Sequence, residues 1–255
     1  MSRLIGLVAP VALIVALLAV WEAACRLLAI PQYLLPAPSA IGLALVQNAG
    51  PLAVSAGRTL AMAMEALAAA AVFAGVLALS VSLSRTLDRA IRPLAVALQV
   101  TPVVAIAPLF VIWAGVDHPD RAIVALAAIV AFFPIFSGAV RGLGSPDPDL
   151  ERLFDLYEAT SVQKLWRLRL PSAIPFIVEG AKVASGLSII GAVVAEFVAG
   201  SGGAEGLAWR ILEAGNRLRT AEMFAAILAL ALMAAAVHLL FQGLERRALV
   251  WWRGR

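Results

Sequence analysis

Long apolar stretches alternate with short polar connections along most of this chain. A helix needs about 20 mostly apolar residues to cross a bilayer, and six stretches have lengths near this value. They cover residues 4–21, 59–84, 93–116, 122–140, 177–199 and 223–244. The pattern predicts an all-α, polytopic membrane protein with six transmembrane helices, and we expect residues 1–255 to form a single transmembrane domain.

The first stretch has a signal peptide as its alternative. Only one basic residue precedes it, its apolar run is too long for a signal peptide core, and residues 22–25 (EAAC) stand where a small-residue cleavage site is expected. We therefore expect an uncleaved membrane anchor.

Composition supports a lipid environment, because 62% of the residues are apolar and 14% are charged. Soluble domains have about 45–50% apolar and about 25% charged residues, so a water-soluble globular protein is excluded. The single cysteine, Cys25, cannot form an internal disulfide, and the two histidines have no metal-ligand spacing. We expect no metal site and no cofactor bound by this chain.

The positions of lysine and arginine predict the orientation, because basic loops stay on the cytoplasmic side. With both termini in the cytoplasm, 13 of the 20 basic residues lie inside, six lie outside, and Lys182 lies at the edge of the fifth stretch. Basic inner loops next to anionic lipid explain the net charge of +4, so nucleic-acid binding is not needed.

A polar segment at residues 141–176 separates the fourth and fifth stretches. In its first part, Pro146 and Pro148 predict a turn, and Asp149 is positioned to cap a following helix. Residues 150–170 have the pattern of one amphipathic helix that ends at Pro171. By itself this pattern favours a helix lying at the lipid interface.

Residues 151–175 (ERLFDLYEATSVQKLWRLRLPSAIP) resemble the EAA loop of bacterial ABC importer permeases. That loop reads EAA, three residues, Gly, nine residues, Ile, any residue and Leu-Pro. Counting back from Leu170-Pro171 puts Leu168 at the Ile position and Glu158 at the Gly position, while residues 152–154 (RLF) replace EAA. Since residues 153–168 contain no other helix breaker, we expect Glu158 to keep a right-handed backbone in a continuous or gently bent helix.

Other strings resemble the permeases for nitrate, sulfonate, taurine and related compounds, and the resemblance extends from Pro31 to Trp252. They are residues 31–41 (PQYLLPAPSAI), 101–115 (TPVVAIAPLFVIWAG), 191–200 (GAVVAEFVAG) and 202–209 (GGAEGLAW).

This resemblance implies a multi-pass permease subunit of the bacterial inner membrane. Its expected partners are a cytoplasmic ABC ATPase dimer, a second copy of the permease, a periplasmic or lipoprotein substrate-binding protein and the lipid bilayer. The sequence has no GxxxxGK[ST] phosphate cradle, so ATP and Mg²⁺ are expected on the ATPase. The cargo implied is a small solute such as a nitrate-, sulfonate- or taurine-like anion or a heterocyclic vitamin precursor. The residues expected to contact the ATPase are Asp155, Tyr157, Glu158, Ala159, Thr160, Ser161, Lys164 and Leu165.

Four residues within the apolar stretches are candidates for the translocation path: Glu65, Trp113, Ser188 and Glu196. A carboxylate at membrane depth is costly and usually faces protein or water. For Glu65 the alternative is a polar pair within the helix bundle, or a position close enough to the outer headgroups for the side chain to reach them. Glu196 is expected to line the path or its gate. Glu179 and Lys182 are expected to pair with each other, and His238 to lie in the interior.

Two other functions are alternatives to this one. An ion-coupled secondary transporter would show inverted repeats and a charged coupling site, and the two halves of this chain have no evident similarity. A membrane-embedded enzyme would need a constellation of His, Asp or Ser at membrane depth, and none is apparent.

The predicted orientation is testable by thiol labelling. A cysteine introduced by Thr160→Cys should react with membrane-impermeant reagents only after the cytoplasmic side is opened, because residues 141–176 are predicted to be cytoplasmic. Labelling of position 160 from outside intact cells would contradict the topology.

Overall fold

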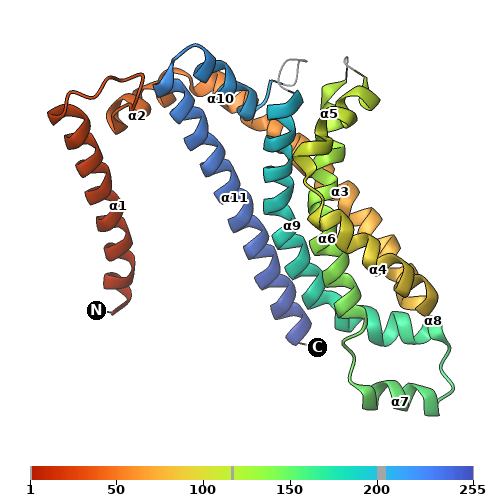
Figure 1. The fold of residues 1–255 in the computed structure, drawn as a ribbon. Helices are drawn as coiled ribbons and strands as arrows, with labels where there is room; N and C mark the ends of the chain where they lie inside the picture. The colour runs from red at the N-terminus through yellow and green to blue at the C-terminus, as the bar shows by residue number, and fades with distance from the viewer. Residues whose placement is uncertain (1, 116–117, 200–204, 255) are drawn as a thin grey trace. The chain divides into compact units, whose positions relative to one another are not determined.

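The computed structural model describes residues 2–115, 118–199 and 205–254. In these residues every regular element is a helix (Figure 1). The chain contacts divide into two compact units, Met1–Gly57 with Glu205–Ala231, and Arg58–Ala204 with Leu232–Arg255. The elements in chain order are α1 (Ser2–Leu27), α2 (Pro38–Gln47), α3 (Ala49–Leu83), α4 (Arg85–Val100), α5 (Val103–Ala114), α6 (Pro119–Leu143), α7 (Pro148–Leu156), α8 (Ser161–Lys164), the π-helical turn η1 (Leu165–Arg169), α9 (Leu170–Ala199), α10 (Leu207–Asn216) and α11 (Thr220–Arg253).

The first unit contains α1, α2, α10 and one end each of α3 and α11. Glu22 on α1 accepts hydrogen bonds from the backbone N–H and the hydroxyl of Ser39 on α2, at 3.0 and 2.8 Å. Arg210 on α10 donates to the hydroxyl of Ser55 on α3 at 2.8 Å. Polar side chains therefore connect the short helices of this unit to its long ones.

The second unit is built around α6 and α9, which lie side by side in close contact (Figure 1). Glycines on both helices allow their backbones to touch. A Cβ atom added to Gly138 on α6 would lie 2.7 Å from the carbonyl oxygen of Phe176. A Cβ atom on Gly180 of α9 would lie 2.7 Å from the carbonyl oxygen of Pro134. Such small-residue contacts are typical of helix packing in membranes, where lipid removes the hydrophobic drive for association.

Alanines dominate the core that surrounds this pair. Ala70, Ala74 and Ala78 on α3 are buried together with Ala131 on α6 and Ala184 on α9. Their spacing of four residues along α3 places one narrow stripe of small side chains against the neighbouring helices. The prediction of an all-α membrane protein is confirmed.

The number of spans differs from the prediction. Among the described residues, four helices are long and apolar enough to cross a membrane by themselves, and α4 with α5 makes a fifth if that bent pair is one span. The four are Ala49–Leu83, Pro119–Leu143, Ser161–Ala199 and Thr220–Trp252. The first predicted stretch forms the helix α1, whose residues 11–20 are all exposed, but a count of six spans is not confirmed.

Residues 93–116, predicted as one span, contain parts of two helices in the portion that the structure describes. The axis bends by 97° between α4 and α5. Thr101 at the end of α4 has φ −69° and ψ 125°, an extended conformation that the following Pro102 favours by steric exclusion of helical geometry. Pro108 lies inside α5 and does not end that helix. Pro102 is therefore the residue that separates the two helices.

The close α6–α9 contact predicts different effects for two glycines on the same helix. Gly180→Ala should destabilise the protein by about 1–3 kcal/mol, because the added methyl group meets the backbone of α6. Gly186→Ala is the matched control, since nothing lies within 4 Å of its added Cβ. Thermal unfolding in detergent measures the difference, and equal melting temperatures for the two variants would contradict the α6–α9 packing.

Candidate functional site

The segment between α6 and α9 reverses the direction of the chain and contains α7. The hydroxyl of Ser145 donates to the carbonyl oxygen of Gly142 at 2.7 Å, which satisfies a group at the end of α6. Asp147, and not Asp149 as predicted, is the N-cap of α7, and its carboxylate accepts the N–H of Asp149 at 2.9 Å. The cap lies at Asp147 because Pro148 occupies the first helical position, where its missing N–H costs nothing.

The prediction of one continuous helix over residues 150–170 is wrong, because α7 ends at Leu156. The N–H of Ala159 donates to the carbonyl oxygen of Phe154 at 3.0 Å, and the N–H of Glu158 donates to that of Asp155 at 2.9 Å. These two bonds form a Schellman motif, in which the residue after the C-cap takes a left-handed conformation. Tyr157 is the C-cap here.

Glu158 occupies that left-handed position, with a φ of +52°. The prediction that it keeps a right-handed backbone is therefore wrong. A residue with a Cβ atom pays about 1–2 kcal/mol for this conformation, which glycine adopts freely. The counting that placed Glu158 at the Gly position of the EAA loop thus identified a position whose backbone geometry suits glycine.

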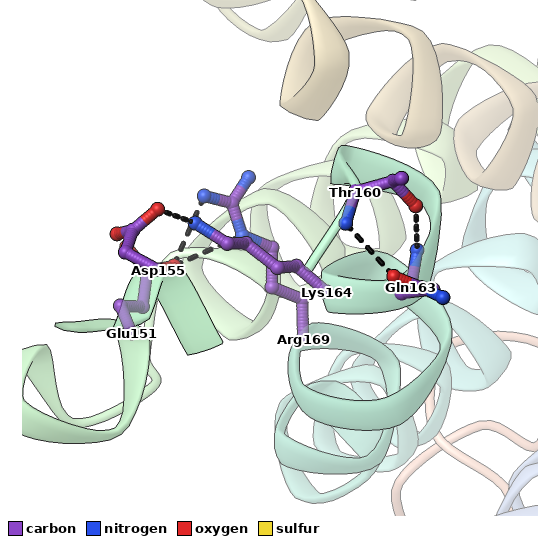
Figure 2. Close-up of polar contacts among 6 residues, drawn as sticks. All are labelled: Glu151, Asp155, Thr160, Gln163, Lys164 and Arg169. Carbon is purple, nitrogen blue, oxygen red and sulfur yellow. Dashed lines mark hydrogen bonds and ion pairs between the residues drawn. The ribbon is translucent and has the colours of Figure 1, made fainter. Parts of the chain in front are cut away.

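A capping box starts the next helix. The hydroxyl of Thr160 accepts the N–H of Gln163 at 3.3 Å, and the side-chain oxygen of Gln163 accepts the N–H of Thr160 at 2.8 Å (Figure 2). The pattern of Thr followed three residues later by Gln is a recognised helix start. This signal is present in the sequence, and it indicates that the preceding helix ends before residue 160.

The second helix continues through Pro171 instead of ending there, since α8, η1 and α9 form one helix over Ser161–Ala199. In η1 the N–H of Leu170 donates to the carbonyl oxygen of Leu165, five residues earlier. A proline inside an α-helix normally collides with the carbonyl group of the preceding turn. The wider π-helical turn just before Pro171 relieves this collision. Because the helix already begins at Ser161, the segment that links it to α6 is shorter than the predicted residues 141–176.

Two ion pairs connect α7 to the second helix (Figure 2). Asp155 pairs with Lys164, and Glu151 accepts from Arg169 at 3.0 Å. Of these four residues, Asp155 and Lys164 were predicted for the site, whereas Glu151 and Arg169 were missed. Sequence spacing contains no signal that these two meet, since they are 18 residues apart.

Large apolar side chains are exposed on this segment although it is polar overall. Leu156, Tyr157 and Trp166 are 81%, 80% and 67% exposed. Among the predicted coupling residues, Asp155, Glu158, Thr160 and Ser161 are exposed as well, and Ala159 is half-buried. Leu165 is buried in the core of the second unit, so it offers no surface to a partner. Exposed apolar patches of this kind mark interaction surfaces.

The four candidates in the helices do not form one cluster. Glu196 on α9 is 1% exposed and accepts the hydroxyl of Thr59 on α3 at 2.7 Å. Ser188 is buried, and its hydroxyl donates to the carbonyl oxygen of Ser185 on its own helix. Glu65 and Trp113 are exposed. Glu196 and Ser188 therefore act within the packed chain, whereas Glu65 and Trp113 are available to something outside it.

Glu65 lines a cavity of about 640 Å³ formed by α3, α4, α5 and α6. Phe73, Phe110 and Phe132 form apolar walls, and Asp120 and Arg121 contribute charged groups. The cavity therefore has aromatic walls, and the carboxylate of Glu65 is part of its lining.

Two minor predictions about charged side chains are wrong. Lys182 pairs with Glu245 on α11 at 2.8 Å rather than with Glu179, which is exposed. A pairing between helices replaces the expected pairing within α9, because α11 brings a carboxylate to Lys182. His238 is exposed on α11 rather than interior.

The left-handed turn predicts different results for two substitutions of Glu158. Glu158→Gly should slow amide hydrogen exchange in α7 about fivefold, because it removes a strain of about 1 kcal/mol. Glu158→Ala keeps the Cβ atom and its strain, and should leave exchange unchanged. Equal slowing in both variants would show that the carboxylate, and not the backbone, is responsible.

Comparison with known proteins places the chain in a family. Residues 68–250 match the family described as binding-protein-dependent transport system inner membrane component. The chain is 32% identical over 252 residues to the formylaminopyrimidine transport permease of Halalkalibacterium halodurans, covering 98% of each protein. It is also 32% identical over 245 residues to the riboflavin transport system permease of Chloroflexus aurantiacus, covering 95% of this chain and 89% of the relative.

A third relative is the taurine transport system permease of Escherichia coli, at 29% identity over 242 residues, with 92% of this chain and 86% of the relative covered. Membership in this family implies a transport subunit rather than an enzyme, with an ATPase and a substrate-binding protein as partners. The chain therefore belongs to the family of binding-protein-dependent transport system inner membrane components, the permease subunits of ABC importers.

Proposed function

We propose that two copies of this chain enclose the path of a small solute and that the α7–α8 segment docks on the partner ATPase. The observation that carries this proposal is the Schellman turn at Glu158, which reproduces at the family's Gly position the backbone conformation that glycine favours. Family membership leaves no role for the two alternatives, a secondary transporter and a membrane-embedded enzyme.

The surface next to this turn suits a protein partner. Leu156 and Tyr157 project beside the exposed carboxylate of Glu158, with Thr160 following directly. An apolar centre with polar groups around it is the usual composition of an interface. In this proposal ATP and Mg²⁺ bind to the ATPase, and this chain contributes the docking surface.

The path is proposed to use residues of two kinds. Glu65 and Trp113 are exposed on the single chain, so they are open to the solute or to the second copy. Glu196 and Ser188 are buried. The bond from Thr59 to Glu196 connects α9 to α3, whereas Ser188 bonds to Ser185 on its own helix. A buried carboxylate with a hydroxyl donor is a group whose loss would disturb both helices.

The cargo is proposed to be a small solute, either an anion of the nitrate, sulfonate or taurine kind or a heterocyclic vitamin precursor. The relatives' names support this range, since they include taurine, riboflavin and formylaminopyrimidine. We place both termini in the cytoplasm, because 13 of the 20 basic residues then lie on the inner side.

A charge reversal at the turn tests the docking proposal. Glu158→Arg should uncouple ATP hydrolysis from transport, because a new positive charge disturbs a surface that approaches the ATPase with a negative one. The measurement is ATPase activity stimulated by the loaded binding protein, in membranes reconstituted with the permease, the ATPase and the binding protein.

Glu179→Arg is the matched control, since it makes the same charge change at an exposed position of α9 outside the α7–α8 segment. If Glu158→Arg retains normal coupling, the segment does not contact the ATPase through this turn, and an interfacial role in lipid becomes the better interpretation.

A further inference from the structure

Side-chain ion pairs hold α7 against the helix that follows it, Ser161–Ala199. None of the α7 residues is buried, so apolar packing does little to hold this helix in place. Glu151 and Asp155 are four residues apart, so both carboxylates project from the same face of α7. That face is the one that meets Lys164 and Arg169 (Figure 2).

The π-helical turn η1 brings the two basic partners into register. Lys164 and Arg169 are five residues apart, and in an α-helix such residues point about 140° away from each other. A π-helical turn has i to i+5 hydrogen bonds, which place residues five apart near one another on the same face. The bond from the N–H of Leu170 to the carbonyl oxygen of Leu165 is of this kind. Both cations therefore face the two carboxylates of α7.

Arg169 makes one further contact, which leaves the α7–α8 segment. Its guanidinium donates to the carbonyl oxygen of Ser82 at 3.3 Å, while the same side chain bonds to Glu151 at 3.0 Å. Ser82 lies in the last turn of α3, which ends at Leu83. The last four carbonyl groups of a helix have no partner within the helix and carry partial negative charge, so a guanidinium is favourable there.

The guanidinium of Arg169 thus bridges Glu151 on α7 and the C-terminal end of α3. A lysine offers one point charge, whereas a guanidinium presents several N–H groups in a fixed plane and can serve two acceptors. The cavity beside it has a volume of about 560 Å³ and is lined by residues of α3, α4, α6 and α7. This space leaves room for α7 and the end of α3 to move.

We propose that Arg169 is a positioning residue that transmits movement of the α7–α8 segment to the C-terminal end of α3. The same helix α3 bears Thr59, which donates to Glu196, and Glu65, which lines the aromatic-walled cavity. A displacement of α7 by the ATPase therefore reaches the candidate path through one side chain. This inference rests on the proposed function, because it takes the ATPase to dock on that segment.

The test follows α3 directly, without knowledge of the cargo. A thiol introduced by Glu65→Cys, with Cys25→Ser removing the native one, reports on α3 in the complex of permease and ATPase. The rate of its reaction with a maleimide is measured without nucleotide and with ATP and vanadate. We expect the two rates to differ when Arg169 is intact, and their ratio to fall to one in Arg169→Gln while the ATPase still co-purifies.

Arg152→Gln is the matched control. It removes an arginine whose ion pair, to Asp149 at 3.0 Å, stays within α7. We expect this variant to keep the nucleotide-dependent difference in labelling. Loss of the difference in both variants would mean that removal of either ion pair on α7 abolishes the response, and would overturn a specific role for Arg169.

A charge swap separates transmission from simple clamping of α7. Glu151→Arg combined with Arg169→Glu restores an ion pair, but a carboxylate cannot donate to the carbonyl oxygen of Ser82. We expect the swap to restore amide protection in α7 and to leave position 65 without a nucleotide response. A full response in the swap would show that the pair to α7 is sufficient, and the contact to α3 would have no role.

The two proposals fail in different ways. If the ATPase co-purifies and Glu158→Arg uncouples it, but Arg169→Gln keeps the response at position 65, docking is correct and transmission through Arg169 is wrong. The absence of any nucleotide response at position 65 with Arg169 intact would equally overturn the transmission. If Glu158→Arg changes nothing, the docking proposal itself is wrong.

Discussion

The second unit depends on the close approach of α6 and α9. Glycines on both helices bring backbone atoms within contact, and side chains larger than hydrogen do not fit at Gly138 or Gly180. Because lipid offers no hydrophobic gain for helix association, this close van der Waals contact has to supply much of the attraction. The segment between the two helices must then leave α6 and return to α9 within a short distance.

The α7–α8 segment meets this requirement with local hydrogen bonds and two ion pairs instead of a core. Its capped helix ends leave few backbone groups unsatisfied, and the left-handed Glu158 closes the turn. Surface ion pairs contribute little each, about 0–1 kcal/mol, so α7 is held loosely compared with the spanning helices. A loosely held helix with exposed apolar side chains is suited to move with a partner.

A buried polar contact also connects two of the long helices. Glu196 is buried and hydrogen-bonded to Thr59, so α3 and α9 are connected by a polar contact where most neighbours are alanines. Removing one partner would leave a buried polar group unsatisfied, which costs about 1–3 kcal/mol or more for a charge. Arg169 contacts the end of α3, and Thr59 on the same helix bonds to Glu196. In the proposed mechanism, α3 therefore connects the α7–α8 segment to the candidate path.

The sequence by itself determined the class of protein and the location of the segment for which docking is proposed. Apolar length predicted the membrane helices, because lipid demands about 20 apolar residues whatever the fold, and the spacing to Leu170-Pro171 identified Glu158 as the turn position. Only the tertiary structure decided the left-handed backbone of Glu158, the bend at Pro102, the helix through Pro171 and the partners of Lys182 and Arg169. The turn at Glu158, the bend at Pro102 and the helix through Pro171 are formed by neighbouring residues, and the structure decided which of the locally allowed conformations is adopted. The partners of Lys182 and Arg169 depend on groups brought together from distant parts of the chain, and local residue spacing contains no information about such encounters.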